Sequence, residues 1–145
     1  MNHEIIARAS EIINSKKDYV GRGMEGYVVL SLINDSGCPT SSAVSISKAD
    51  GLNWLSFLGG TNSNKAKRIR NCSKACVCIA TSEYNITLTD TAEVITDPAV
   101  KKEHWQEIFS EHYGDYNNQD VCVFYFTTES YNLSLPMITQ QPQVR

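Results

Sequence analysis

The chain has 145 residues, of which 41% are hydrophobic and 20% charged, and its formal net charge is −3. This length and composition predict one globular domain spanning residues 1–145 with a substantial core. The acidic balance argues against general nucleic-acid binding, which needs a basic surface, and no apolar run approaches the ~20 residues that cross a bilayer, so we expect no membrane association.

The first half of the chain predicts an N-terminal helix in residues 1–17 and three strands. Apolar residues recur at the spacing of one helical face at Ile5, Ile6, Ala9, Ile12 and Ile13. Residues 26–33 form an apolar strand, a turn follows at 34–37, and 40–48 alternate as a return strand. A third strand at 52–58 completes a predicted antiparallel meander.

The stretch after the third strand carries the most concentrated chemistry. Gly59-Gly60 ends the strand, and a helix then begins with Asn62 or Ser63 as its cap. The first turn of a helix has unpaired N–H groups and a partial positive charge, so a phosphate can bind there. Lys65 lies in this turn, where a lysine is unfavourable unless an anion offsets its charge.

Four further basic residues follow Lys65 closely: Lys67, Arg68, Arg70 and Lys74. A solvated surface helix would explain the same charges. The glycine pair and the helix cap favour an anion site instead.

The second half predicts strands at 75–80 and 84–95, the latter bent near Asp90-Thr91. Asp97-Pro98 then starts a helix whose apolar stripe runs to Phe109, before Gly114 stops it. A strand at 121–126 closes the β structure, and residues 134–145 form a loose tail. About six strands with these helices predict a mainly β fold, an antiparallel β-barrel with peripheral helices.

The cysteines predict no metal site. Without a signal sequence at the N-terminus we expect a cytoplasmic protein with five reduced cysteines. Cys76 and Cys78 have the period of a strand, and no second CxxC or histidine cluster completes a tetrahedral set. His3, His104 and His112 are candidate haem ligands, although none has a motif around it.

Residues 26–126 resemble the pyridoxamine 5′-phosphate oxidase-like family, which folds as a six-stranded, Greek-key-like, FMN-binding split barrel. The motif that carries the resemblance is Ser63-x-Lys65 followed by Ile69-x-Asn71. Residues 84–94, Asp97 and the helix with Trp105 are similar to the later half of the family pattern.

The resemblance implies that Ser63, Asn64 and Lys65 hold the phosphate of FMN. It further implies that the hairpin strand, the end of the next strand and one amide contact the rest of the flavin, through Ala43, Val44, Ser45, Lys48, Leu58, Gly59 and Asn85. Because such sites lie between two subunits in the family, a homodimer with the cofactor at its interface is implied.

This chain departs from the family pattern at several positions. Ala43 stands where an arginine is common, Gly59 replaces a threonine, and Asn64 replaces a second basic residue. Asp90 stands where glycine is frequent, whereas Lys48 fits a basic position. These changes predict weaker FMN binding. The tail also lacks the Arg-x-His element of the true oxidase, so vitamin B6 oxidation is rejected.

The leading functional hypothesis is therefore a small flavoprotein that uses FMN as an oxidoreductase or reductase. Its small-molecule substrate and its catalytic residues are unknown, and NAD(P)H is the candidate electron donor. One alternative is a module that binds or stores a flavin, haem or deazaflavin without turnover. Another is a structural or regulatory protein that has lost its cofactor.

Overall fold

The computed structural model describes residues 3–136. It contains seven strands: β1 (Tyr27–Ile33), β2 (Pro39–Ser45), β3 (Lys48–Asp50), β4 (Trp54–Gly60), β5 (Lys74–Ala80), β6 (Asn85–Ile95) and β7 (Val121–Ser134). The helices are α1 (His3–Lys16), α2 (Asn64–Asn71), α3 (Pro98–Glu103) and α4 (Ser110–Tyr113), with short 3₁₀ turns η1 (Lys17–Tyr19), η2 (Met24–Gly26) and η3 (Glu107–Phe109).

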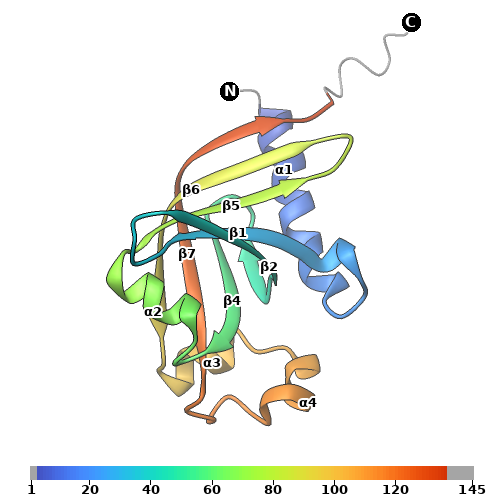
Figure 1. The fold of residues 1–145 in the computed structure, drawn as a ribbon. Coiled ribbons are helices and arrows are strands. Elements are labelled where there is room, and N and C mark those ends of the chain that lie inside the picture. Colours follow the sequence, from blue (N-terminus) through green and yellow to red (C-terminus); the bar gives the residue numbers. More distant parts are fainter. Residues whose placement is uncertain (1–2, 137–145) are drawn as a thin grey trace, which may run out of the picture.

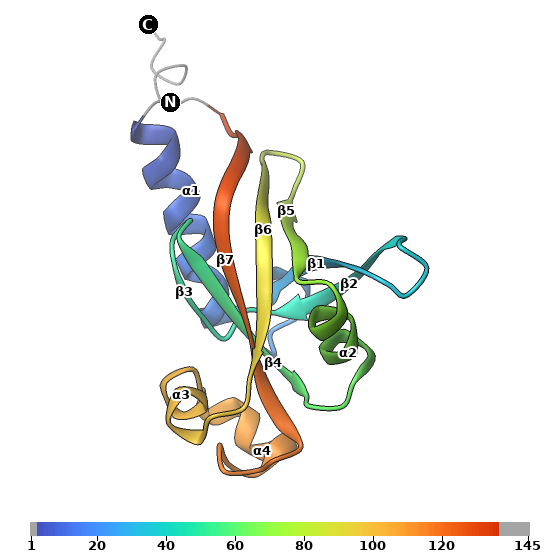
Figure 2. The same cartoon turned by 90° about the vertical axis from the view of Figure 1, so that its left-hand side faces the viewer.

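All seven strands belong to one antiparallel sheet with the order β2-β1-β5-β6-β7-β4-β3. The sheet curls, as Figures 1 and 2 show from two sides, and β2 touches β4 although the two are not hydrogen-bonded neighbours. The inner face carries the core, which includes Leu30, Val77, Leu88, Phe124 and Phe126. The predicted mainly β split-barrel fold is therefore confirmed.

The helices cover different parts of this sheet. α1 packs against β3 and β7, and α3 packs against β7 near the other end of the molecule (Figure 2). α2 contacts β1, β4 and β6 and buries Ala66 and Ile69. None of the helices in residues 3–136 is long and apolar enough to cross a membrane.

The predicted strand over 40–48 is interrupted, which makes the expectations of six strands and of a meander wrong. β2 ends at Ser45, and the fully buried residues Ile46 and Ser47 carry the chain to the other edge of the sheet. There the Ser47 N–H donates to Ser56 O at 2.7 Å, and its hydroxyl donates to His104 O. β4 consequently pairs with β3 and β7 instead of β2.

β7 is longer than the predicted 121–126 because it pairs with β6 along almost its whole length. The ladder contains a bulge: Thr89 pairs with Ser130 and Asp90 pairs with Thr128, so Glu129 has no partner residue. This bulge lies next to the bend predicted at Asp90-Thr91. Of the predicted tail, Ser134 belongs to β7, and 137–145 lie outside the described residues.

The predicted helix beyond Pro98 breaks into α3, η3 and α4. α3 ends at Glu103 with His104 as its C-cap, and Ile108, expected on a buried stripe, is 46% exposed. Lys101 in α3 is 1% exposed. Its Nζ donates to Asn118 O at 2.8 Å and to Val121 O at 3.2 Å, which ties the loop before β7 to the helix.

Candidate functional site

The candidate anion site begins at the N-terminus of α2. Ser63 is the cap: its Oγ accepts a hydrogen bond from the Ala66 N–H at 3.2 Å, as predicted for one of the two candidate caps. Within residues 3–136, the N–H groups of Asn64 and Lys65 donate to no protein acceptor. These two groups and the Ser63 hydroxyl proton remain available to an anion.

Lys65 adds a positive charge to this helix start. Its side chain is half-buried and forms no ion pair or hydrogen bond in the part of the chain that the structure describes. Of its basic neighbours, Arg68 donates to Thr40 Oγ1 at 3.3 Å and Arg70 to Thr61 O at 2.7 Å. Lys65 is thus a first-turn cation without an internal partner, and no carboxylate is paired with it within residues 3–136.

The end of β4 leads directly into this corner. Leu58 pairs with Val123 and Gly59 pairs with Cys122 of β7. A Cβ on Gly59 would lie 2.5 Å from Cε2 and 2.8 Å from Cζ of Phe124, a core residue. The Phe124 ring therefore occupies the space that a threonine side chain would need, which gives a physical reason for glycine at this position.

The predicted contacts on the hairpin strand lie at two edges of the sheet. Ala43, Val44 and Ser45 belong to edge strand β2, where Val44 packs against the core. Lys48 begins β3 and pairs with Ser56. Ala43 lines a pocket of about 780 Å³ and Lys48 lines another of about 600 Å³, and Ser63, Asn64 and Lys65 line neither.

Asn85 is not brought next to α2 within one chain. It begins β6 at the tip of the β5–β6 hairpin, which Figures 1 and 2 place at the opposite end of the hairpin from α2. Seven-residue β5, at about 3.3 Å per residue, separates the two by roughly 20 Å. The Asn85 Oδ1 accepts from Thr87 Oγ1 at 3.2 Å and from Cys78 Sγ at 3.9 Å.

Ala43 belongs to a group of uncharged residues on the outward side of the sheet, with Asn85 on the same side of β6 and the exposed Lys74 at its border. Cross-strand pairing aligns two rows over β2, β1, β5, β6 and β7: Ala43, Val29, Cys78, Thr87 and Asn132, then Ser41, Ser31, Cys76, Thr89 and Ser130. We call these ten residues the uncharged sheet face. Val29 is 38% exposed, so this face includes one open apolar side chain.

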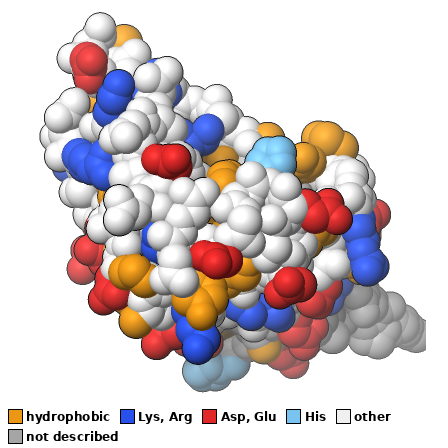
Figure 3. All heavy atoms as spheres, turned by 90° about the horizontal axis from the view of Figure 1, so that it is seen from below, with side chains coloured by type: hydrophobic (Ala, Val, Ile, Leu, Met, Phe, Trp, Pro, Cys, Tyr) orange, Lys and Arg blue, Asp and Glu red, His pale blue; other side chains and the backbone are white. Residues whose placement is uncertain are grey.

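The end of the molecule around α3 and α4 carries charged side chains, unlike the uncharged sheet face. Figure 3 shows the face around α3 and α4, where basic and acidic side chains are intermixed with hydrophobic ones and form no continuous patch of one sign among the coloured residues.

Sequence reasoning missed a buried pair, Ser56 and His104. His104 Nδ1 lies 2.7 Å from Ser56 Oγ, and the ring makes edge contacts with Trp54 at 5.4 Å and Tyr125 at 5.7 Å. His104, Trp54 and Tyr125 border the pocket that contains Lys48. Nothing local in the sequence relates two residues 48 positions apart, so no pattern could have identified the pair.

His104 gives the protein a pH-dependent stability. Burial lowers the pKa of its imidazole; Glu103 opposes this shift and Lys48 adds to it. Between the lowered folded pKa and the ordinary value of 6.5, the unfolded chain binds more protons. The free energy of unfolding is therefore expected to fall as the pH drops below about 6.5, by up to about 1.4 kcal/mol per pH unit.

Urea titrations between pH 5 and 7 would measure this slope. In His104→Asn the slope should flatten, whereas His112→Asn, at a residue of α4 away from this pair, should leave it unchanged. Equal slopes in wild type and His104→Asn would refute the assignment.

The cysteines form no metal site in the described residues, where no group of three or more His, Cys, Asp or Glu could hold an ion. All five cysteines are free thiols, and burial raises the pKa of Cys122 to about 11. Cys122 is thus an unreactive core residue at neutral pH.

The comparisons with known proteins bear on the fold and the family of this chain. A family model described as pyridoxamine 5′-phosphate oxidase like matches residues 27–133. No curated protein matches the sequence.

Several solved structures share the fold. A Clostridium acetobutylicum protein related to general stress protein 26 is 20% identical, with a TM-score of 0.79 over 93% of this chain and 91% of that one. General stress protein 26 of Bacillus anthracis is 16% identical, with a TM-score of 0.64 over 83% and 92%. An F420 reductase is 15% identical, with a TM-score of 0.56 over 73% and 88%. At these identities the structures establish the fold, and the family model adds the membership: the chain belongs to the pyridoxamine 5′-phosphate oxidase-like family.

Proposed function

We propose that this protein binds FMN between two copies of the chain and is an oxidoreductase for a small molecule. The observation that carries the proposal is the start of α2, where two unpaired N–H groups, the Ser63 hydroxyl and the unpaired Lys65 meet. This set of donors fits a phosphate group. A bound flavin would supply the hydride chemistry, and the residues of this chain would position it.

The uncharged sheet face supports the proposal that a second copy of the chain binds there. An uncharged surface that exposes Val29 costs less to dehydrate than a charged one when a protein covers it. Because Ala43 lies in this face and Asn85 begins the same side of β6, a second chain packed there would carry its own copies of both to the interface. Association would thereby bring to the shared interface the amide that one chain alone keeps about 20 Å from α2.

The test is FMN affinity, measured by titration in phosphate-free buffer. Ser63→Ala combined with Lys65→Ala should weaken FMN binding about 10- to 100-fold, because two contacts to a charged phosphate are lost. Lys67→Ala is the matched control: Lys67 is an exposed residue of the same helix and should leave affinity unchanged. Equal affinity of wild type and double variant would reject the phosphate site.

Turnover is tested separately, by adding NADH or NADPH to the FMN-loaded protein and following the loss of oxidised-flavin absorbance. Binding without reduction would instead support a module that carries the flavin. The similarity to an F420 reductase makes a deazaflavin the second cofactor to try. A wild-type protein that binds neither would favour a structural or regulatory role.

A further inference from the structure

The cavity of about 780 Å³ that Ala43 lines lies between α1, η2 and the β5–β6 hairpin, and it borders the uncharged sheet face at Val29 and Cys78. Its floor consists of buried core side chains: Ile12, Val28 and Ile79. Tyr19, Tyr27 and Tyr84 stand among its walls. This size and apolar lining are typical of small-molecule pockets.

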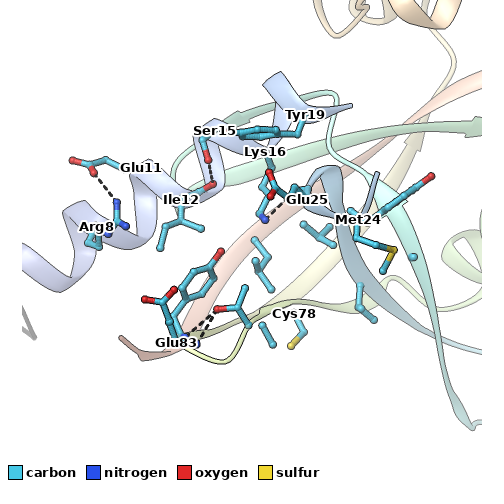
Figure 4. A pocket seen from close by; sticks show the side chains of 18 residues that line it. Arg8, Glu11, Ile12, Ser15, Lys16, Tyr19, Met24, Glu25, Cys78 and Glu83 are labelled. Atoms are coloured by element: carbon cyan, nitrogen blue, oxygen red, sulfur yellow. Dashed lines mark hydrogen bonds and ion pairs between the residues drawn. The ribbon is translucent and has the colours of Figure 1, made fainter. Parts of the chain in front are cut away.

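Lys16, the last residue of α1, reaches into this cavity. In Figure 4 its side chain points from α1 across the pocket toward Glu25. The residue is 9% exposed, and its Nζ donates to Glu25 O at 3.0 Å. A lysine amine has up to three N–H donors, so one hydrogen bond within the described residues leaves most of its capacity unused.

Burial also changes the chemistry of this amine. It lowers the pKa of Lys16, and the nearby Glu25 carboxylate offsets the shift only in part. A larger fraction of Lys16 is therefore neutral near pH 8 than of an exposed lysine, and the neutral amine is the nucleophilic form.

The charges of the lining decide which ligand suits the pocket. Arg8 and Lys16 face three carboxylates, those of Glu11, Glu25 and Glu83. Arg8 is paired with Glu11 at 3.4 Å on the exposed rim. With more negative than positive groups around it, the cavity disfavours an anion, whereas its apolar floor accepts an uncharged body.

We propose that this pocket binds a neutral, apolar aldehyde or ketone and that Lys16 Nζ forms a Schiff base with it. The amine nitrogen attacks the carbonyl carbon, a C–N bond forms, and the carbonyl oxygen leaves as water with the two protons of the amine. The step requires neither an oxidant nor a reductant. The Glu25 carboxylate stabilises the positive charge of the protonated imine, as it does that of the ammonium.

Reductive trapping tests the proposal on the full chain. Protein is incubated with benzaldehyde and sodium cyanoborohydride, and the rate of modification of each lysine is followed by peptide mass spectrometry. Lys16 should be modified at least 10-fold faster than Lys67, an exposed lysine, and the rate should saturate with benzaldehyde concentration. Modification of Lys16 no faster than that of Lys67 would overturn the proposal.

Two variants sharpen the result. Lys16→Arg keeps the charge and the donor to Glu25 O but cannot form an imine, so saturable modification should disappear. Lys17→Arg is the matched control, because Lys17 Nζ also donates to one backbone oxygen, that of Asn14 at 3.0 Å, and lies outside this pocket. It should retain modification at Lys16. If Lys16→Arg fails to fold, the rates of modification of Lys16 and Lys67 in the wild-type protein decide whether the proposal holds.

Discussion

Replacing Gly59 with threonine is expected to lower the free energy of unfolding by about 3 kcal/mol. The new Cβ would lie 2.5 Å and 2.8 Å from two atoms of the Phe124 ring, which is 1% exposed and cannot swing into solvent. Either the ring or the β4 backbone must shift, and both are held by the β4–β7 ladder. Urea unfolding of the two proteins measures the difference.

Two further variants identify the cause. Gly60→Ala is the control, since its nearest contact, Ser63 Cβ at 3.4 Å, is ordinary van der Waals distance, and it should change stability by less than about 1 kcal/mol. Phe124→Leu removes the ring atoms that clash, so adding Gly59→Thr to it should cost much less than in the wild type. Equal costs in both backgrounds would show that Phe124 is not the obstacle.

Lys101→Ala is expected to lower the free energy of unfolding by about 3 kcal/mol, the second large effect. The substitution leaves a cavity where a fully buried side chain stood and deprives Asn118 O and Val121 O of their donor. Lys101→Met keeps most of the side-chain volume, so its free energy of unfolding should fall by less. The fall that remains measures the loss of the two hydrogen bonds.

Lys102→Ala provides the comparison for this pair. Lys102 is the exposed neighbour, with its Nζ 5.8 Å from the Tyr116 ring centre, and its loss should cost about 0.5 kcal/mol. Thermal unfolding of the three variants measures all of these differences. A cost for Lys101→Ala as small as that for Lys102→Ala would contradict the role of Lys101 as a tether.

Elements with local signals were predictable from the sequence. The apolar stripe of α1, the Asn34–Gly37 turn before β2 and the Asp97-Pro98 start of α3 each depend on neighbouring residues, and each is confirmed. The break between β2 and β3 was not predictable. It depends on hydrogen bonds from Ser47 to Ser56 and His104, which are distant in sequence.

The same distinction holds for the site. The cap at Ser63 and the placement of Lys65 follow from a few adjacent residues, and the structure bears them out. The reason for Gly59 lies in a ring 65 positions later, and the burial of Lys101 depends on a loop 17 to 20 positions away. Whether the full set of predicted contacts binds FMN stays a prediction until the titration is done.

The bulge at Glu129 sets the phase of hydrophobic alternation in β7. Before it, even-numbered residues such as Phe124 and Phe126 face the core; after it, the odd-numbered Leu133 and Leu135 pack there. Deleting Glu129 would restore a regular ladder and leave Leu133 opposite the buried Ile86, whereas one further paired residue inserted after the bulge would turn both leucines to solvent. The single extra residue therefore reconciles two opposite alternations within one strand, and its loss is the change of length that β7 should tolerate best.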